Sequence, residues 1–234
     1  MNNNKVVFVT GGDSGIGRET CIRFSKEGYT ISFSYCSNKK EAEETAKECF
    51  KNGAFDVFFV QLDLTKNEKI EDRLNMIINR FGKIDILVNN AGILIKKRFN
   101  ELSFDEIDKL IQINLLGALK VTRRVLPHMR KLEKGIIINI ASIAGIRVKE
   151  KEAVYCASKT ALIIFTKALS LELPKNIRIY VVNPRATATK MTGFKGDPPQ
   201  EVANIIFNVA EENLNKKSGE EINVWEYLDG EKFE

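Results

Sequence analysis

Three polar residues with a defined spacing could perform acid–base chemistry: Tyr155, Lys159 and Ser142. A phenol has an ordinary pKa of about 10, and an ammonium group beside it favours the phenolate and lowers that pKa. A hydroxyl such as that of Ser142 can hold a carbonyl or alcohol oxygen while the tyrosine moves a proton. The three residues therefore predict the interconversion of a ketone and an alcohol, provided that a hydride carrier binds next to them.

The residues around Tyr155 predict a helix with one buried face. Apolar side chains recur there at intervals of three and four residues: Ala157, Ala161, Ile164, Ala168 and Leu171. Residues four apart share a helix face, so Tyr155 and Lys159 lie together. Tyr35 and Lys39 have the same spacing where a β-type segment meets a turn, and we interpret that pair as chance. Without support from the rest of the chain, a solvated helix surface would be the better interpretation of Tyr155 and Lys159 as well.

Short runs of β-branched and aromatic residues alternate with helical patterns along the whole chain. The predicted strands are 5–10, 30–35, 56–61, 84–89, 135–141, 177–183 and 221–224. The predicted helices are 15–27, 39–52, 66–81, 103–133, 153–173 and 198–211. Apolar strands separated by helices predict a parallel sheet with both faces covered and right-handed crossovers. We expect one domain over residues 1–234, an α/β fold with a Rossmann-like, doubly wound, seven-stranded parallel sheet in three α/β/α layers.

Two further expectations follow from this pattern. Ligands of such folds bind beyond the carboxyl ends of the strands, so the functional residues should come directly after strands. Pro127 stands inside the fifth helical stretch and predicts a kink or a joint there, because proline lacks an N–H group and crowds the preceding turn.

Composition excludes several classes of function. One histidine, His128, and four cysteines without Cys-x-x-Cys spacing, at 21, 36, 49 and 156, argue against a zinc site and against multi-histidine catalysis. Reduced thiols, residues 1–4 without a secretion signal and the lack of an apolar run of about 20 residues predict a cytoplasmic protein without a membrane span.

The net charge of +5 is spread along the chain, with local basic groups at 96–98 and 123–134. No aromatic residues alternate with these charges, so we favour a solvated surface over nucleic-acid binding. A landing site for an acidic partner, such as a carrier protein or the phosphates of coenzyme A, is the alternative.

A glycine-rich segment follows the first predicted strand and opens a helix. Gly11 allows a tight turn, Gly15 allows close approach of a pyrophosphate, and Gly17 allows the helix to pack on the strand. The spacing Gly-x-x-x-Gly-x-Gly resembles that of the short-chain dehydrogenase/reductase family, in particular the carbonyl-reducing 3-oxoacyl-carrier-protein reductases. Further motifs of this family recur in order over residues 5–192: Asp63-Leu64, Asn89-Asn90-Ala91-Gly92, Asn114, Ser142, Tyr155-Cys156-Ala157-Ser158-Lys159 and Asn183-Pro184.

The resemblance implies a nicotinamide cofactor and a catalytic group. Asp63 is expected to bind the adenine, Asn90 to Gly92 the adenine ribose, Tyr155 and Lys159 the nicotinamide ribose, and Thr187 and Thr189 the carboxamide. The full expected cofactor site is Gly11, Ser14, Gly15, Ile16, Gly17, Tyr35, Ser37, Asp63, Leu64, Asn90, Ala91, Gly92, Tyr155, Lys159, Pro184, Thr187 and Thr189. The expected catalytic residues are Asn114, Ser142, Tyr155 and Lys159, and no metal takes part.

In the implied reaction Tyr155 protonates a carbonyl oxygen that Ser142 orients, Lys159 lowers the tyrosine pKa, and Asn114 holds a water that leads to solvent. Each residue also has a simpler interpretation in isolation. Asn89-Asn90 and Ser142 suit strand-ending turns, and Asn114 suits a polar residue bonded within its own helix.

The end of the second strand predicts NADP(H) rather than NAD(H). NAD sites place a carboxylate there to bind the ribose 2′-hydroxyl, whereas this chain has Tyr35. Cys36, Ser37, Asn38, Lys39 and Lys40 follow, so no acid repels a 2′-phosphate, although the arginine frequent in NADP-binding relatives is also missing.

The chain departs from the family in three places. Arg185 replaces a usual glycine, and we expect it to pair with an anionic substrate or cofactor phosphate, or to point to solvent. The substrate-covering loop is shortened to about 190–199, which predicts an open site, a lid from a partner subunit, or reduced activity. The tail 225–230 predicts either an interface or packing on its own sheet.

Three functions stay open at this point. The leading hypothesis is an NADPH-dependent carbonyl reductase, with 3-oxoacyl thioesters among its substrate classes. An NAD(P)-dependent alcohol or sugar dehydrogenase is the alternative enzyme, and a non-catalytic dinucleotide-binding regulator is the alternative outside enzymes. The family resemblance also implies a homodimer or homotetramer formed through 103–133 and 153–173. The fold class does not determine the substrate, its stereochemistry or the direction of reaction.

Overall fold

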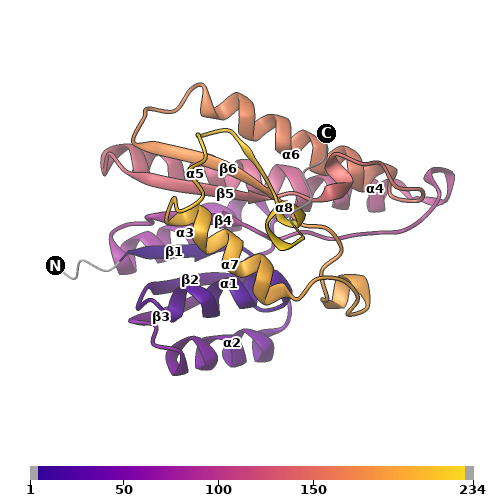
Figure 1. The fold of residues 1–234 in the computed structure, drawn as a ribbon. Coiled ribbons are helices and arrows are strands. Elements are labelled where there is room, and N and C mark those ends of the chain that lie inside the picture. The colour runs from indigo at the N-terminus through magenta and orange to yellow at the C-terminus, as the bar shows by residue number, and fades with distance from the viewer. Residues whose placement is uncertain (1–4, 230–234) are drawn as a thin grey trace.

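A single parallel sheet forms the centre of the computed structural model, which describes residues 5–229. Within these residues seven strands lie in the order β3-β2-β1-β4-β5-β6-β7, and every neighbouring pair is parallel. Their bounds are β1 Val6–Val9, β2 Thr30–Tyr35, β3 Asp56–Gln61, β4 Ile86–Asn89, β5 Gly135–Ile140, β6 Ile177–Asn183 and β7 Glu221–Asn223. Figure 1 shows α1 (Gly15–Ser25) and α7 (Pro199–Ala210) in front of this sheet and α5 (Gly117–Lys131) behind it. The predicted doubly wound, seven-stranded α/β fold is confirmed.

The alternating side chains of the strands explain why both faces are covered. In β1, Val7 and Val9 belong to one apolar cluster, whereas Phe8 between them belongs to another. In β5, Ile138 and Ile137 divide in the same way. Because successive strand residues point to opposite faces, an all-apolar strand needs helices on both sides.

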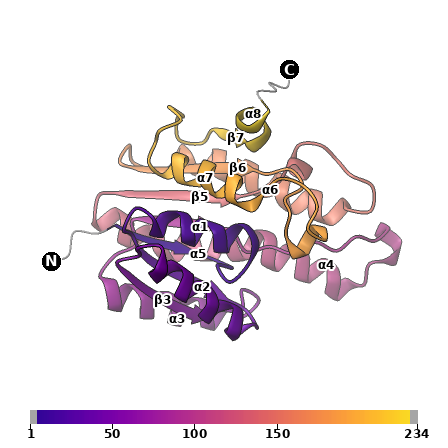
Figure 2. The same cartoon turned by 60° about the horizontal axis from the view of Figure 1, so that its bottom comes forward.

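Helices pack against both faces of the sheet. Their bounds are α1 Gly15–Ser25, α2 Lys39–Lys51, α3 Asn67–Phe81, α4 Phe104–Ile111, α5 Gly117–Lys131, α6 Ala153–Ser170, α7 Pro199–Ala210 and α8 Val224–Leu228. Residues of α1, α2 and α7 join the cluster that contains Val7, and residues of α3 and α5 join the cluster that contains Phe8. Figure 2 shows α1 and α7 beside each other over the sheet, in agreement with their close contact.

The long helical stretch predicted over 103–133 is divided at a different point from the expected one. A π-helical turn, Gln112–Leu116, separates α4 from α5, and α5 continues through Pro127. Of the predicted kink or joint at Pro127, the joint is therefore wrong, and the kink stays a prediction. Pro127 lies on the exposed face of α5, where water can hydrate the carbonyl that proline leaves without a donor. The wide turn instead contains Asn114, whose side chain bonds outside its helix.

No helix among residues 5–229 is long and apolar enough to cross a bilayer. Residues 1–4, from which the sequence predicts no secretion signal, lie outside the described residues, as does Gly230 at the end of the predicted tail segment.

Candidate active site

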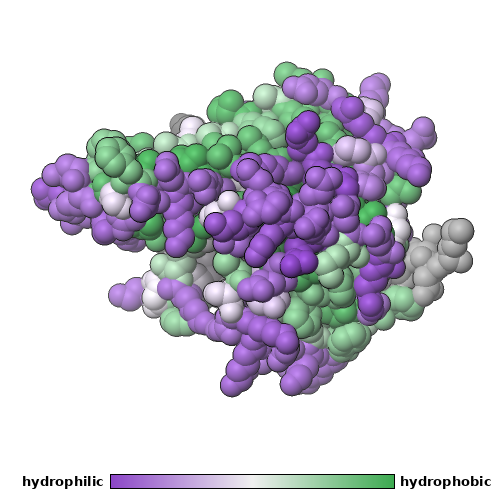
Figure 3. Space-filling view, turned by 180° about the vertical axis from the view of Figure 1, so that it is seen from behind, coloured by the Kyte–Doolittle hydropathy of each residue, from purple (hydrophilic) through white to green (hydrophobic). Residues whose placement is uncertain are grey.

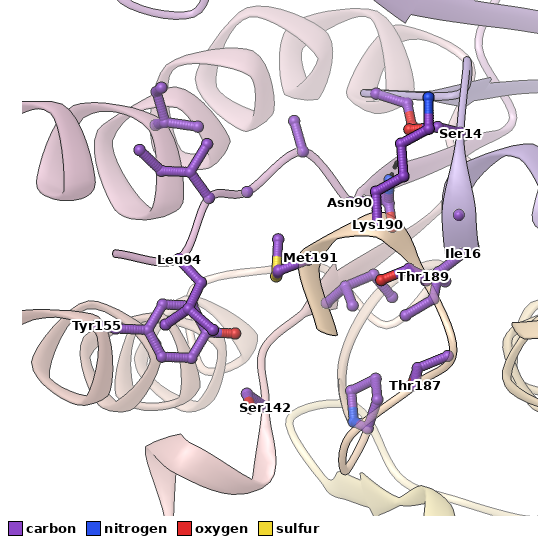
Figure 4. Close-up of a pocket in the computed structure, with 18 of the residues that line it drawn as sticks. Ser14, Ile16, Asn90, Leu94, Ser142, Tyr155, Thr187, Thr189, Lys190 and Met191 are labelled. Atoms are coloured by element: carbon purple, nitrogen blue, oxygen red, sulfur yellow. Dashed lines mark hydrogen bonds between the residues drawn. The ribbon is translucent and has the colours of Figure 1, made fainter. Parts of the chain in front are cut away.

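A cleft of about 510 Å³ opens at the carboxyl edge of the sheet, a volume within the usual range for small-molecule sites. Residues that directly follow six strands line it, as the position of ligand sites in doubly wound folds predicts. Of the predicted site residues, the cleft is lined by Gly11, Ser14, Gly15, Ile16, Tyr35, Ser37, Asp63, Leu64, Asn90, Ala91, Gly92, Ser142, Tyr155, Lys159, Pro184, Thr187 and Thr189. Gly17 and Asn114 are not in its lining. Figure 4 shows part of this cleft.

The turn between β1 and α1 presents bare backbone to the cleft. Gly15 has a φ of 53°, and a Cβ atom there would approach Thr189 Cγ2 to 3.0 Å. Gly17 lies so close to the turn that a Cβ atom would be 2.1 Å from the Gly11 carbonyl oxygen. The first N–H groups of α1 and the partial positive charge of the helix N-terminus could bind an anion at Gly15. This cradle fits the pyrophosphate of a dinucleotide.

Asn90 connects the turn after β4 to the turn after β1. Its Nδ2 donates to the carbonyl oxygens of Thr10 and Gly11, both at 3.0 Å. The N–H groups of Asn90 and Ala91 donate to Thr10 Oγ1, also at 3.0 Å. The side chain of Asn90 therefore fixes the shape of the glycine turn. Neither interpretation from the sequence, a strand-ending turn residue or a contact to the adenine ribose, included this role.

Asp63 lies after β3 at the other wall of the cleft. Its Oδ1 accepts from Thr65 N at 2.9 Å and from Thr65 Oγ1 at 2.7 Å. Burial raises the pKa of Asp63, but the Thr65 hydrogen bonds and the nearby Lys66 and Lys69 outweigh it, so the pKa falls below its ordinary value. A charged acceptor at this place suits the amino group of an adenine.

Tyr155, Lys159 and Ser142 converge at the opposite end of the cleft. The Lys159 Nζ atom is 5.9 Å from the centre of the Tyr155 ring and donates to the carbonyl oxygen of Ile140 at 2.8 Å. Tyr155 and Lys159 are buried, 8% and 4% exposed. Figure 4 shows the Tyr155 hydroxyl directed into the cleft, with Ser142 on the same side. The predicted helix face therefore turns toward the cleft and not toward bulk solvent.

Burial controls the protonation of this group. Burial raises the pKa of Tyr155, and the nearby Glu152 carboxylate raises it further. A hydrogen bond with Ser142 lowers this pKa but does not outweigh burial. The expected lowering of the Tyr155 pKa is therefore wrong, because desolvation of the phenolate dominates. Burial also lowers the pKa of Lys159 to about 8. At neutral pH the tyrosine thus stays protonated, which is the form that acts as a general acid.

Asn114 lies behind the cleft wall, in the π-helical turn. Its Oδ1 accepts from Ile93 N at 2.7 Å, and its Nδ2 donates to Ile93 O at 2.9 Å and to Ser158 Oγ at 3.2 Å. A Cβ atom on Gly92 would meet Asn114 Oδ1 at 3.3 Å and Lys159 Nζ at 3.4 Å. Asn114 therefore bonds outside its own helix, contrary to the simpler interpretation, and lies on the Lys159 side of the site. Its place in a water relay stays a prediction.

A buried polar chain behind the site was not predicted. Asn89 Nδ2 donates to Thr122 Oγ1 at 2.9 Å and to Asn139 Oδ1 at 2.8 Å, and Asn139 Nδ2 donates to Thr166 Oγ1 at 2.8 Å. All four side chains are buried. These hydrogen bonds join α5, β4, β5 and α6, and so fix the position of α6, which carries Tyr155, relative to the sheet. An asparagine inside the otherwise apolar strand 135–140 was the available signal.

Arg185 forms contacts that neither sequence alternative included. Its Nε donates to Asp197 Oδ1 and Oδ2 at 3.0 and 2.8 Å, and its Nη1 pairs with Asp229. Asp197 closes the short loop through backbone hydrogen bonds with Ala186 and Ala188. The predicted shortened loop is thus closed by its own backbone hydrogen bonds, and Arg185 connects it to Asp229 at the end of the C-terminal helix α8.

The described part of the tail packs within its own chain, where α8 contacts α7 and Leu228 contacts the cluster that contains Val7. Packing rather than an interface is therefore the interpretation that the structure favours. Trp225 is 2% exposed and contacts the core, whereas Tyr227 is 39% exposed. Several charged residues of the cleft were missed by sequence reasoning, among them Glu152 and Lys190. Glu152 is buried and pairs with Lys96 at 3.2 Å, and Lys190 pairs with Glu41. Neither belongs to a recognisable motif, so only the folded chain brings them to the cleft.

A glycine cradle at one end and a tyrosine–lysine–serine group at the other define a dinucleotide-dependent oxidoreductase of the Rossmann-like class. The family model of the short chain dehydrogenases matches residues 5–199. The chain belongs to the short-chain dehydrogenase family, whose members are NAD(P)-dependent enzymes.

Similar proteins include a cyclopentanol dehydrogenase from a Comamonas species, 37% identical over 205 residues, or 87% of this chain and 81% of that protein. A 3-oxoacyl-[acyl-carrier-protein] reductase from Thermotoga maritima is 32% identical and covers 94% of this chain and 96% of its own length. The solved structure of an alcohol dehydrogenase from the archaeon Thermococcus sibiricus, complexed with 5-hydroxy-NADP, matches with a TM-score of 0.85 and 26% identity over 94% of this chain and 96% of that one.

Proposed function

We propose that this protein is an NADP(H)-dependent carbonyl reductase that converts a ketone to a secondary alcohol. The observation that carries the proposal is the convergence of Tyr155, Lys159 and Ser142 in one cleft with a bare glycine turn. When bound, the nicotinamide cofactor supplies a hydride. The protein's own residues supply the proton and hold the reacting oxygen.

The roles follow from the environment of each group. Ser142 donates a hydrogen bond to the carbonyl oxygen and stabilises the negative charge that develops on it. Tyr155 transfers its proton to that oxygen, and its raised pKa keeps the proton available at neutral pH. Lys159 holds the nicotinamide ribose and stabilises the phenolate after proton transfer, since its ammonium form predominates below about pH 8. Asn114 holds a water that links Lys159 to solvent, and a proton that passes along this path restores the Tyr155 hydroxyl.

The cofactor choice rests on the end of β2. Tyr35, Cys36 and Ser37 line the cleft there and offer no carboxylate to a ribose 2′-hydroxyl. The Thermococcus sibiricus relative binds an NADP derivative, which supports the same preference. A comparison of kcat/KM for NADPH and NADH tests it, and a preference for NADH would contradict this part of the proposal.

The reverse reaction is the second candidate. The same residues oxidise a secondary alcohol when the tyrosine acts as a base, and the cyclopentanol dehydrogenase is the relative with 37% identity. For reduction, the similarity to a 3-oxoacyl-[acyl-carrier-protein] reductase favours 3-oxoacyl thioesters as the first class to assay. Exposed lysines at the cleft, Lys96, Lys109 and Lys149, suit a substrate that carries phosphate groups.

A cofactor-oxidation assay across cyclic ketones, diketones and 3-oxoacyl thioesters tests the proposal, with Tyr155→Phe as the matched variant. The variant should lose at least about 10²-fold in kcat, the usual range for loss of a general acid, while its cofactor affinity stays within about twofold. Turnover by Tyr155→Phe at the wild-type rate would remove the tyrosine from its role. Cofactor binding without turnover of any carbonyl or alcohol would favour a regulator.

We also propose that a second copy of the chain covers the outer face of α6. Ala153, Ala157, Ala161 and Ile164 line a shallow hollow there, and Ile164 is 57% exposed. Figure 3 shows hydrophobic surface along the rim of the molecule at which α6 lies in Figure 1. Light scattering tests this proposal, and a monomeric mass at micromolar concentration would contradict it.

A further inference from the structure

Lys190 lies where the short loop after β6 meets the cleft, and the catalytic scheme assigns it no role. It opens the 3₁₀ turn Lys190–Thr192. Its ammonium group forms an ion pair with Glu41, in the first turn of α2. The Lys190 side chain is 64% exposed, and the residue lines the cleft together with Asp13 and Ser14. Figure 4 shows Lys190 extending toward Ser14.

The residue before Lys190 fixes this position. Thr189 lies directly over Gly15, because its Cγ2 atom is 3.0 Å from the point where a Gly15 Cβ would stand. Gly15 is the first residue of α1, where the free N–H groups could bind an anion. Lys190 therefore extends across the phosphate-binding turn toward the ribose end of the cleft, which Tyr35 and Ser37 line.

The charged groups around Lys190 affect how strongly this corner of the cleft attracts an anionic ligand. Burial and the nearby Glu41 carboxylate raise the pKa of Asp13, and Lys190 opposes that change. Lys190 is thus paired with Glu41 and close enough to Asp13 to favour its charged form. Lys39, at the start of α2, pairs with Glu43 at 3.5 Å. Loss of Lys190 would remove the ammonium group that faces Glu41 and Asp13 and so weaken the attraction of this corner for a phosphate.

We propose that Lys190 is a phosphate ligand of the dinucleotide cofactor and that Glu41 competes with the phosphate for it. The proposal deepens the function proposed above and rests on it. An exposed ion pair is weak, so a doubly charged or bridging phosphate displaces Glu41 readily. The dinucleotide offers a pyrophosphate and, in NADPH, a 2′-phosphate. Both present the same oxygen chemistry to an ammonium group.

Equilibrium binding of NADPH and NADH, followed by nicotinamide fluorescence, tests the proposal without any substrate. Lys190→Met should weaken NADPH binding about tenfold, the usual effect of one charge-assisted hydrogen bond. Lys195→Met is the matched control, since Lys195 is an exposed lysine of the same loop that does not line the cleft, and it should change the Kd less than about twofold. A loss for NADPH alone assigns the 2′-phosphate, and an equal loss for both cofactors assigns the pyrophosphate.

Glu41→Gln provides a second measurement with the opposite sign. It frees Lys190 and should tighten NADPH binding about two- to fivefold, a gain that poorer folding cannot produce. Equal affinities for Lys190→Met and Lys195→Met, or weaker binding by Glu41→Gln, would overturn the proposal and leave the proposed reductase intact. Failure of the wild-type chain to bind either dinucleotide would overturn both.

Discussion

Replacing Arg185 by methionine should loosen the short loop and the C-terminal helix together. The substitution removes two hydrogen bonds to Asp197, at 3.0 and 2.8 Å, and the ion pair with Asp229. Asp197 is only 13% exposed in its side chain, whereas Arg185 is 33% exposed. Solvent screens such a half-buried group, so we expect a loss of about 1–3 kcal/mol in the free energy of unfolding, less than for a fully buried pair.

For a chain of this size that loss corresponds to a Tm lower by about 2–10 °C. Loop 186–197 should also be cleaved faster in limited proteolysis and exchange its amide hydrogens faster. Because Thr187, Thr189 and Lys190 lie on this loop and line the cleft, the cofactor KM should rise more than kcat falls. Arg178→Met is the matched control, since Arg178 lies in β6, the strand that precedes Arg185, and pairs with Glu212.

The reasoning fails if Arg185→Met leaves proteolysis of the loop and the cofactor KM at wild-type values. It fails equally if Arg178→Met changes both to the same extent. Either result would mean that the loop holds its shape through its backbone hydrogen bonds alone, such as those of Asp197 with Ala186 and Ala188.

Three further predictions concern the two ends of the cleft. Gly17→Ala should abolish measurable cofactor binding by calorimetry, since its Cβ would lie 2.1 Å from Gly11 O and 2.5 Å from Asn90 Nδ2, and wild-type affinity would contradict the close packing. Ser142→Ala should lower kcat by about 10²-fold with little change in the cofactor Kd, and an unchanged kcat would exclude an oxyanion role. Lys159 has a folded pKa of about 8, below its ordinary 10.5, so burying its ammonium form destabilises the protein fully below pH 8, and this cost disappears as the pH rises to 10.5. Lys159→Met should therefore be more stable than wild type in urea at pH 7 by about 1–3 kcal/mol, with the advantage shrinking above pH 8, and a pH-independent difference would contradict the assignment.

The fold could be predicted because its signals are local. In each of the segments 30–35 and 135–140 four of the six residues are β-branched or aromatic, and glycines at 11, 15 and 17 mark the turn that follows β1. Spacing along one helix also placed Tyr155 and Lys159 on a common face. These features depend on neighbours in the sequence, so the sequence alone is sufficient to predict them.

The remaining features depend on partners far along the chain. Arg185 meets Asp197 and Asp229, which are 12 and 44 residues away, and no local pattern specifies that choice. The π-helical turn exists where Asn114 bonds to Ile93, 21 residues earlier, whereas Pro127 gave a stronger local signal and no break. The pKa of Tyr155 moved in the direction opposite to prediction because burial is a property of the assembled fold.

The central claim is that the Tyr155 hydroxyl delivers a proton to an oxygen bound beside the nicotinamide ring. The most direct test is a crystal structure with NADP⁺ and a secondary alcohol. The account predicts the alcohol oxygen within about 3.2 Å of both Tyr155 Oη and Ser142 Oγ, and its carbon roughly 3–3.5 Å from the nicotinamide C4. A cofactor whose nicotinamide ring lies at the other end of the cleft, away from Tyr155, would contradict it.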